Sequence, residues 1–462
     1  MRTIPIVAIA PRPARGGLAA VGDLLRRHRG AIAALQWAIV LIYAVLVVVP
    51  AFMPLPPAGA SIVDNLTLAA QFAFWGLWWP FVILGTMLFG RVWCGVLCPE
   101  GALAEAASRH GLGRAIPRWV RWGGWPFVAF VLTTVYGQLV SVYEYAQAAL
   151  LVLGGSTVAA AAIGFVYGRG VRVWCRYLCP VSGVFALLAR VAPLHFRIDR
   201  AAWAAFPARS AAVDCAPLLD VKHLRGAAQC HACGRCSGHR GAVVLAARSP
   251  NAEILGSTPR DVRTGEALLL VFGLLGVAIG AFQWTLSPWF VAGKQAAAAW
   301  LVDHESFALL DDGAPWWLLT HVPQAGDVFT WLDGIAILAY IAAVAVVLGG
   351  TVYAGVRGAA RLARTDWRVL ALALVPLAGI GIFLGLSMLT LTQLRAEGVM
   401  VPALGALRAA LLALGLGWSA WLGWRMLARA GVGGARRGLA RLAFAAALAP
   451  VGAAWWLSFF VW

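Results

Sequence analysis

Long apolar runs alternate with short polar segments along most of the chain. Nine of these runs consist largely of Ala, Leu, Val and Gly, and each approaches or exceeds the roughly 20 residues that a helix needs to cross a bilayer. The runs cover 31–53, 67–90, 122–142, 147–167, 267–290, 331–355, 368–391, 404–427 and 439–461. This pattern predicts an all-α integral membrane protein with about nine transmembrane helices.

One long stretch lacks such a run. Residues 197–265 are rich in Arg, Asp, Pro and Gly, and we expect them to form a small insert outside the bilayer. The predicted parts are a basic N-terminus (1–30), a four-helix membrane unit (31–196), the insert (197–265) and a five-helix membrane domain (266–462). The apolar run 181–196 is short and holds Arg190 and His195, so it predicts a helix lying at the membrane interface.

Composition supports a membrane location. Of the 462 residues, 61% are hydrophobic and only 12% are charged, and the mean hydropathy is +0.80. A soluble domain carries about 25% charged residues, so most of this surface must face lipid. The net charge of +18 could suggest nucleic acid, but the basic residues crowd into short loops. We therefore expect membrane lipid as a partner and no nucleic acid.

The loops alternate in their content of basic residues, which predicts an orientation. The Arg-rich segments are 1–30, 91–121, 168–266, 357–368 and 425–441, and the basic-poor loops are 54–66, 291–330 and 392–403. The positive-inside rule places the Arg-rich side in the cytoplasm. We expect a multi-pass protein of the bacterial cytoplasmic (inner) membrane, with its N-terminus cytoplasmic and its C-terminus periplasmic. The first apolar run is too long for a signal-peptide core, which favours a retained span.

A nine-residue motif occurs twice. The segment RVWCGVLCP at 91–99 returns 81 residues later as RVWCRYLCP, with seven of nine positions identical. Each copy follows a predicted span that ends on the same side of the membrane. Such self-similarity indicates a duplicated unit, here a helix hairpin whose exit carries a Cys-x3-Cys-Pro motif. The pairs Cys94 and Cys98, and Cys175 and Cys179, should therefore reach the same face.

The spacing of these cysteines has chemical meaning. Cysteines four residues apart can present both sulfurs on one side of a turn, and a following proline suits the first position of a helix. We expect helices to begin at Pro99 and Pro180, where the helix dipole favours thiolates and an anionic cluster. All eight cysteines fall between 94 and 236, which argues against simple buried hydrophobes, and disulfides are rare in the cytoplasm. Metal or cluster ligation is the better interpretation.

The insert contributes a third cysteine group. Cys230, Cys233 and Cys236 have the Cys-x2-Cys-x2-Cys spacing that lets one loop hold three corners of an iron–sulfur cubane. In ferredoxins a fourth cysteine follows four residues later, where this chain has Arg240. Cys215 is the natural substitute for that ligand, although a non-cysteine ligand stays open.

Zinc is the rival occupant of the insert group. His223, His231 and His239 lie near these cysteines, but tetrahedral zinc usually uses two separated ligand pairs. Four cysteines come from the duplicated motif and four from the insert, which matches two [4Fe-4S] clusters with four thiolates each. We identify no residue as a catalytic acid or base.

At these residues the chain resembles the polyferredoxin-like membrane proteins of the NapH, NosR and CcoG group. The mark of that group is a pair of Cys-x3-Cys-Pro motifs at membrane-helix ends, followed by a ferredoxin-type segment, and the resemblance covers roughly 30–245. It implies [4Fe-4S] binding and electron transfer linked to the quinone pool or to a periplasmic redox partner. Two departures leave the subfamily open. The ferredoxin segment has one recognisable cysteine group rather than two, and 267–462 adds five spans.

Histidines and polar residues in the spans are scarce. None of the eight histidines lies in a predicted span, so we expect no membrane-embedded haem b. Gln283, Asp333 and Gln393 lie near predicted span ends and are the polar candidates for contact with a quinone. The alternative is that these spans have only a structural role, as a helix bundle packed through Gly and Ala.

Together these features predict a membrane-bound iron–sulfur electron-transfer protein that links a cytoplasmic or periplasmic redox partner to the quinone pool. The partner would be a ferredoxin, a cytochrome or a membrane complex, and the chain would be an electron carrier or a component of a quinol-linked oxidoreductase. One alternative is an accessory factor that reduces a metal ion during assembly of another membrane redox enzyme. Another is a transporter with the clusters as sensor, although the spans lack the paired intramembrane charges expected of a solute pathway.

Overall fold

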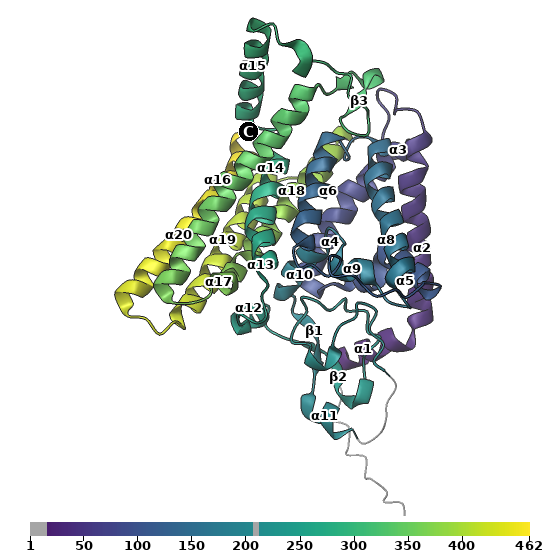
Figure 1. The fold of residues 1–462 in the computed structure, drawn as a ribbon, viewed down its shortest axis with the longest axis vertical. Coiled ribbons are helices and arrows are strands. Elements are labelled where there is room, and N and C mark those ends of the chain that lie inside the picture. The colour runs from purple at the N-terminus through teal and green to yellow at the C-terminus, as the bar shows by residue number, and fades with distance from the viewer. Residues whose placement is uncertain (1–15, 207–211) are drawn as a thin grey trace, which may run out of the picture.

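The fold is a bundle of long apolar helices with a small insert at one end (Figure 1). The computed structural model describes residues 16–206 and 212–462, so residues 1–15 of the predicted basic N-terminus lie outside the described residues. Within the described part, eight helical segments are long and apolar enough to cross a membrane. They are α2 (Arg29–Val48) with η1 (Pro50–Phe52); α3 (Leu66–Gln71), η2 (Phe72–Trp78) and α4 (Trp79–Phe89); α7 (Ala146–Ala149), η4 (Leu150–Gly154) and α8 (Gly155–Tyr167); α13 (Thr264–Leu268), η8 (Leu269–Val277) and α14 (Ala278–Gln283); α16 (Trp331–Ala363); α17 (Trp367–Ala371), η11 (Leu372–Leu374) and α18 (Val375–Ala396); α19 (Leu404–Ala428); and α20 (Gly434–Trp456) with η12 (Leu457–Val461). The predicted all-α membrane fold is confirmed.

Shorter elements occupy the connections between these segments. They are α1 (Gly17–Arg27), η3 (Trp93–Leu97), α5 (Pro99–Arg109), α6 (Trp125–Leu139), α9 (Val173–Tyr177), α10 (Ser182–Leu188), η5 (Ala189–Val191), β1 (Leu194–Ile198), α11 (Arg200–Ala205), η6 (Val221–His223), η7 (His239–Gly241), β2 (Val243–Ala247), α12 (Ala252–Gly256), α15 (Pro288–Asp303), η9 (Phe307–Leu309), β3 (His321–Val322), η10 (Pro323–Ala325) and β4 (Asp327–Val328). Strands β1 and β2 pair antiparallel within the insert, from Leu194 opposite Ala247 to Ile198 opposite Val243. Helix α1 packs on β2.

The predicted span at 122–142 is shorter than expected. Its helix, α6, has 15 residues, which is about 22 Å at 1.5 Å per residue. Pro126 lies in the first turn, so the helix starts late, and Ser141, with φ of 48°, lies just beyond its end. These local signals interrupt an apolar run that is otherwise long enough to span.

Both ends of α6 nevertheless lie beside the ends of the segment from α13 to α14. At one end, a Cβ on Gly265 would lie 2.6 Å from the carbonyl oxygen of Gly123. At the other end, Trp284 Nε1 donates a hydrogen bond to Gln138 Oε1 at 2.7 Å. Helix α6 with its flanking turns thus extends over the same height of the bundle as its 20-residue neighbour.

The segment from α17 to α18 lies at the centre of the bundle. Of its most apolar stretch, 94% is buried, against 11% for the segment from α7 to α8. Helix α18 packs against α4 and η2 from the first half of the chain and against α19 from the second, so the two halves share one core. Outer helices expose apolar side chains such as Leu41 and Val346, as expected for surfaces that face lipid.

The apolar segment 181–196 is too short to span a membrane, as predicted, and its helix is buried against other helices. It forms the short helix α10, turn η5 and strand β1, and Val184 and Phe185 are only 3% and 2% exposed. The helix packs against α4, α6, η8 and α18. Arg190 at the end of this segment is buried too, and Glu253 and Glu266 pair with it.

Candidate metal centre

The cysteines of the two motif copies face one cavity. Cys94 lies on η3, Cys98 caps the N-terminus of α5, Cys175 lies on α9 and Cys179 lies in the turn that follows α9. All four line a cavity of about 110 Å³. The structure therefore brings together the two pairs that the sequence predicted as halves of one site.

The two copies contact each other through equivalent arginines. Arg91 of the first copy donates a hydrogen bond to Ser182 Oγ, beyond the second cysteine pair, at 2.8 Å. Ser182 Oγ donates in turn to the carbonyl oxygen of Cys175 at 2.7 Å. Arg172, the equivalent of Arg91, donates to the carbonyl oxygen of Cys94 at 2.5 Å. Each arginine thus supports the cysteine segment of the other copy, Arg172 directly and Arg91 through Ser182.

The two motif helices start differently. Helix α5 begins at Pro99 as predicted, and the Gly101 amide donates to Cys98 Sγ at 3.4 Å. The prediction for Pro180 is wrong, because α10 begins two residues later, at Ser182. The Ser182 amide instead closes a turn onto the carbonyl oxygen of Cys179 at 3.1 Å. Only the first pair therefore has a cysteine at a helix N-cap.

The insert cysteines surround a second, smaller cavity. Cys215, Cys230, Cys233 and Cys236 all line this space of about 20 Å³. The backbone around Cys233 is tightly turned, since Gly234 has a φ of 75°. That conformation favours glycine and reverses the chain between neighbouring cysteines. All four insert cysteines predicted from the sequence thus lie at one site.

The histidines considered for zinc have other surroundings. His223 pairs with Asp220 at the surface at 2.6 Å, and the rings of His239 and Trp203 lie 5.2 Å apart. His231 is 2% exposed, and its Nδ1 has no hydrogen-bond partner among the described residues. Within those residues, no three His, Cys, Asp or Glu side chains converge closely enough to hold one metal ion. Four cysteines spread around a cavity favour a polynuclear cluster over zinc.

The two cysteine sites adjoin at Gly95. A Cβ at this position would overlap the carbonyl oxygen of His231 and would lie 2.9 Å from the backbone nitrogen of Cys233. The equivalent residue in the second copy is Arg176, which donates to Gln229 Oε1 at 3.0 Å. Gly95 and Arg176 occupy equivalent positions at which the two copies differ in sequence, and both residues contact the insert. The sequence repeat alone gave no sign of this docking.

Glu105 joins both motif copies to the insert. It accepts hydrogen bonds from Arg172 at 2.8 Å and from Arg235 at 2.7 and 2.9 Å, and Arg235 lies between Cys233 and Cys236. The side chains of Arg172 and Glu105 are 1% and 6% exposed. Burial works to raise the pKa of Glu105, but the charges of Arg172 and Arg235 hold it below its usual value. Sequence reasoning missed this residue because nothing local marks it.

Burial dominates the chemistry of the thiols. It raises the pKa of Cys175 to about 12 despite the nearby charge of Arg172. Burial and then the neighbouring Cys175 and Cys94 raise the pKa of Cys98. In the insert, burial raises the pKa of Cys230 to about 12. Thiolates crowded in these sites require a cationic partner, as coordination to iron would supply.

The donor sets therefore fit the iron–sulfur clusters that the sequence predicted. The motif cysteines would hold one [4Fe-4S] cluster, and the insert cysteines would hold the other. When bound, such clusters supply one-electron redox chemistry whose potential depends on charge, hydrogen bonds and solvent exposure around the sulfurs. The chain contributes mostly apolar cavities, the buried guanidinium groups of Arg91 and Arg172, and the Gly95 contact between the two sites.

An apolar cavity of about 160 Å³ adjoins the motif site inside the bundle. The two cavities share seven lining residues, which are Trp79, Thr133, Val152, Leu153, Pro180, Val181 and Phe185. The polar residues singled out from the sequence do not line the apolar cavity. Gln283 bonds to Ala454 and Ser458, Asp333 caps α16 and binds Lys294, and Gln393 lies near Gly76. Thr133, Thr134, Gln138 and Tyr143 supply its polar groups instead.

Comparisons with known proteins agree with this site. The family described as "4Fe-4S binding domain" matches the chain twice, at 71–122 and 150–199, and each match contains one motif copy. The chain is 28% identical over 182 residues to the "Regulatory protein NosR" of Pseudomonas aeruginosa. That match covers 34% of this chain and only a quarter of the relative's length. No solved structure matches. The chain is thus a multi-pass membrane protein with a duplicated 4Fe-4S binding domain, and these matches confirm its resemblance to the NapH and NosR group of membrane iron–sulfur proteins.

Proposed function

We propose that the protein carries electrons between a redox partner and a quinone in the membrane, through two [4Fe-4S] clusters. The observation that carries this proposal is the shared wall between the motif-cysteine cavity and the apolar cavity among the spans. A quinone ring is flat and apolar with carbonyl oxygens at its edge. It suits a small cavity lined by aromatic and aliphatic side chains with a few polar groups.

The lining residues have distinct roles in this proposal. Trp79 and Phe185 provide apolar faces for a ring and exclude water from the wall beside the cysteines. The Thr133 and Thr134 hydroxyls are donors that suit a quinone carbonyl oxygen. Pro180, which directly follows Cys179, belongs to the shared wall. The proline of the motif thus brings the cysteine site next to the apolar cavity.

The orientation and partner belong to the same proposal. The insert would face the cytoplasm of a bacterium whose inner membrane holds the protein, because the Arg-rich loops lie on that side. The described chain starts with α1 beside the insert, and Trp462 packs against Trp289 at the start of α15. In this proposal the C-terminus would therefore lie on the periplasmic side. A ferredoxin, a cytochrome or a membrane complex would exchange electrons with the clusters.

The test fills the apolar cavity and leaves the cysteines intact. Ala281 lines that cavity but not the cysteine site, so Ala281→Leu narrows it. The matched control is Ala339→Leu, which adds the same side chain at an exposed position of α16. Iron content and thermal unfolding of both variants show whether the fold and clusters survive.

The readout is the rate at which a quinol analogue changes the cluster absorbance under anaerobic conditions. We expect Ala281→Leu to slow this reaction at least tenfold relative to Ala339→Leu, while the rate with reduced methyl viologen stays unchanged. Equal rates in the two variants, or clusters in the wild-type protein that do not respond to quinol, would refute the quinone link. Reduction of Cu²⁺ without any response to quinol would favour the accessory metal-reducing role.

A further inference from the structure

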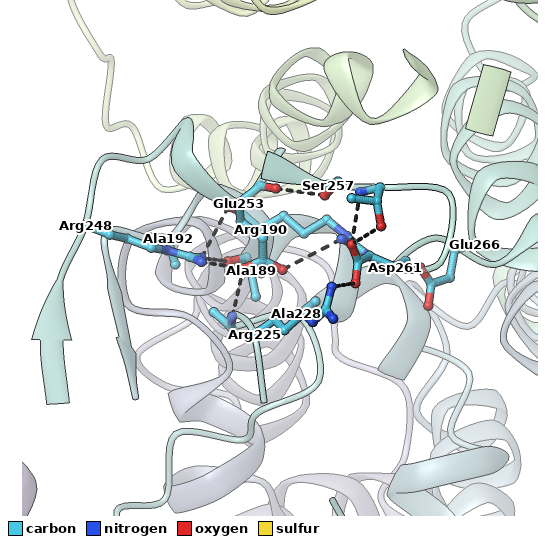
Figure 2. Close-up of polar contacts among 12 residues, drawn as sticks. Ala189, Arg190, Ala192, Arg225, Ala228, Arg248, Glu253, Ser257, Asp261 and Glu266 are labelled. Atoms are coloured by element: carbon cyan, nitrogen blue, oxygen red, sulfur yellow. Dashed lines mark hydrogen bonds and ion pairs between the residues drawn. The ribbon is translucent and has the colours of Figure 1, made fainter. Parts of the chain in front are cut away.

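A polar cavity of about 550 Å³ lies where the insert meets the helix bundle. Figure 2 shows the residues around its Arg190 wall, which come from η5, the insert and the start of the α13 segment. Arg263 lines the cavity and directly precedes Thr264, the first residue of that spanning segment. The cavity therefore lies at the level where the span begins, close to the expected membrane surface.

All four acidic side chains that line this cavity already have basic partners. Arg190 lies 3.7 Å from Glu253 and 2.8 Å from Glu266, and Arg248 lies 2.5 Å from Glu253. The other two pairs are Asp261 with Arg225 at 3.2 Å and Asp220 with His223 at 2.6 Å. The arginine pairs, several of which appear in Figure 2, balance the charges of Glu253, Glu266 and Asp261. His223 balances Asp220 only when it is protonated.

Three cations of the cavity lack an acidic partner within the described residues. They are Arg176, Arg260 and Arg263. Arg176 is half-buried; burial lowers the pKa of its guanidinium group, and the nearby charge of Arg263 lowers it further. The positive-inside bias explains why this side of the protein is rich in Arg, but it does not explain why three guanidinium groups without an acidic partner among the described residues line one cavity. Several positive charges that line one cavity favour the binding of an anion there.

We propose that this cavity binds a phosphate group, carried either by a soluble phosphate ester or by the headgroup of an anionic lipid. The cavity volume lies within the roughly 300–1,000 Å³ of small-molecule sites. Guanidinium groups match phosphate oxygens through paired hydrogen bonds, and a phosphate ester carries up to two negative charges. Basic pockets at the membrane surface also bind anionic headgroups.

The position of the site connects it to both cysteine groups. Arg176 directly follows Cys175, and its hydrogen-bond partner Gln229 directly precedes Cys230. A bound phosphate would therefore lie against the segment that joins the motif site to the insert. The proposal concerns binding alone, so it stands or falls independently of the quinone link.

The test titrates inorganic pyrophosphate into the full-length protein by calorimetry, with the protein in nanodiscs of phosphatidylcholine. Arg263→Gln removes one exposed cation from the cavity, and the control Arg197→Gln removes an exposed insert cation that does not line it. We expect saturable binding that Arg263→Gln weakens at least tenfold and Arg197→Gln leaves unchanged. Absence of saturable binding, or equal weakening by both variants, would overturn the proposal.

A second arm separates the two sources of phosphate. The same titration is repeated in nanodiscs that contain phosphatidylglycerol. Loss of pyrophosphate binding in these nanodiscs would identify a lipid headgroup as the natural ligand, since the lipid already occupies the site. Unchanged binding would identify a soluble phosphate ester. Circular dichroism and iron content of each variant confirm that its fold and clusters are intact.

Discussion

The substitution Glu105→Gln should loosen the insert from the two motif copies. Glu105 is the acceptor for Arg172 and Arg235, and the side chain of Arg172 is only 1% exposed. Without the carboxylate, the Arg172 charge stays buried with no counter-ion. Removing one partner of a buried ion pair costs about 3–5 kcal/mol. Since glutamine keeps one hydrogen-bond acceptor, we take about 3 kcal/mol, which makes opening of this junction about 150-fold more frequent.

Hydrogen–deuterium exchange of the insert measures that opening directly. The amide of Arg172 donates to the carbonyl oxygen of Ala216 at 2.7 Å, so backbone hydrogen bonds cross the junction and report on it. The matched control is Glu100→Gln on the same helix. Burial raises the pKa of Glu100, which bonds to Trp174 without an ion pair, so glutamine changes little there. We expect faster exchange over 212–247 in Glu105→Gln only.

Two outcomes would refute this reasoning. Exchange in the insert could be the same in Glu105→Gln and Glu100→Gln, which would mean that the buried carboxylate does not hold the insert. Alternatively, Glu105→Gln could accelerate exchange throughout the bundle, including α18, which would mean that the residue stabilises the whole fold rather than the junction.

Three further predictions follow from the same contacts. Gly95→Ala should push the insert away and weaken the magnetic coupling between the two reduced clusters in EPR, whereas Gly85→Ala, which meets no atom within 4 Å, should leave it unchanged. Cys215→Ser should lower the iron content by up to half and spare the motif cluster. Because the folded-state pKa of Glu105 lies below its ordinary value of 4.5, its stabilisation is present above that pH and disappears as the pH falls through the folded pKa. The rates of amide hydrogen exchange in the insert should therefore differ between wild-type protein and Glu105→Gln at pH 7 and become equal in strong acid. A difference in rate that stays constant with pH would contradict this.

Much of the architecture could be predicted from the sequence, because lipid imposes a long apolar run on each spanning helix. The spacing of Cys94, Cys98, Cys175 and Cys179 likewise predicted that both pairs meet at one site. The length of α6 was not predictable from hydropathy, since Pro126 and the turn near Ser141 shorten a largely apolar run that holds no charged residue.

Long-range ion pairs account for most of what the sequence did not reveal. Arg172 and Arg235 lie 67 and 130 residues from Glu105, so no local pattern joins them. The burial of Arg190 likewise depends on long-range ion pairs, because its partners Glu253 and Glu266 follow the insert cysteines in the sequence. The apolar cavity is also a property of packing, which explains why polar residues near span ends were poor guides to it.

The most direct test of the central claim compares the iron and sulfide content and the EPR spectra of Cys94→Ser, Cys175→Ser and Cys233→Ser after anaerobic purification. If the two motif copies form one site, Cys94→Ser and Cys175→Ser should lose the same cluster signal and keep the signal that Cys233→Ser removes. Loss of different signals in Cys94→Ser and Cys175→Ser, or zinc in place of iron in the wild-type protein, would contradict this account.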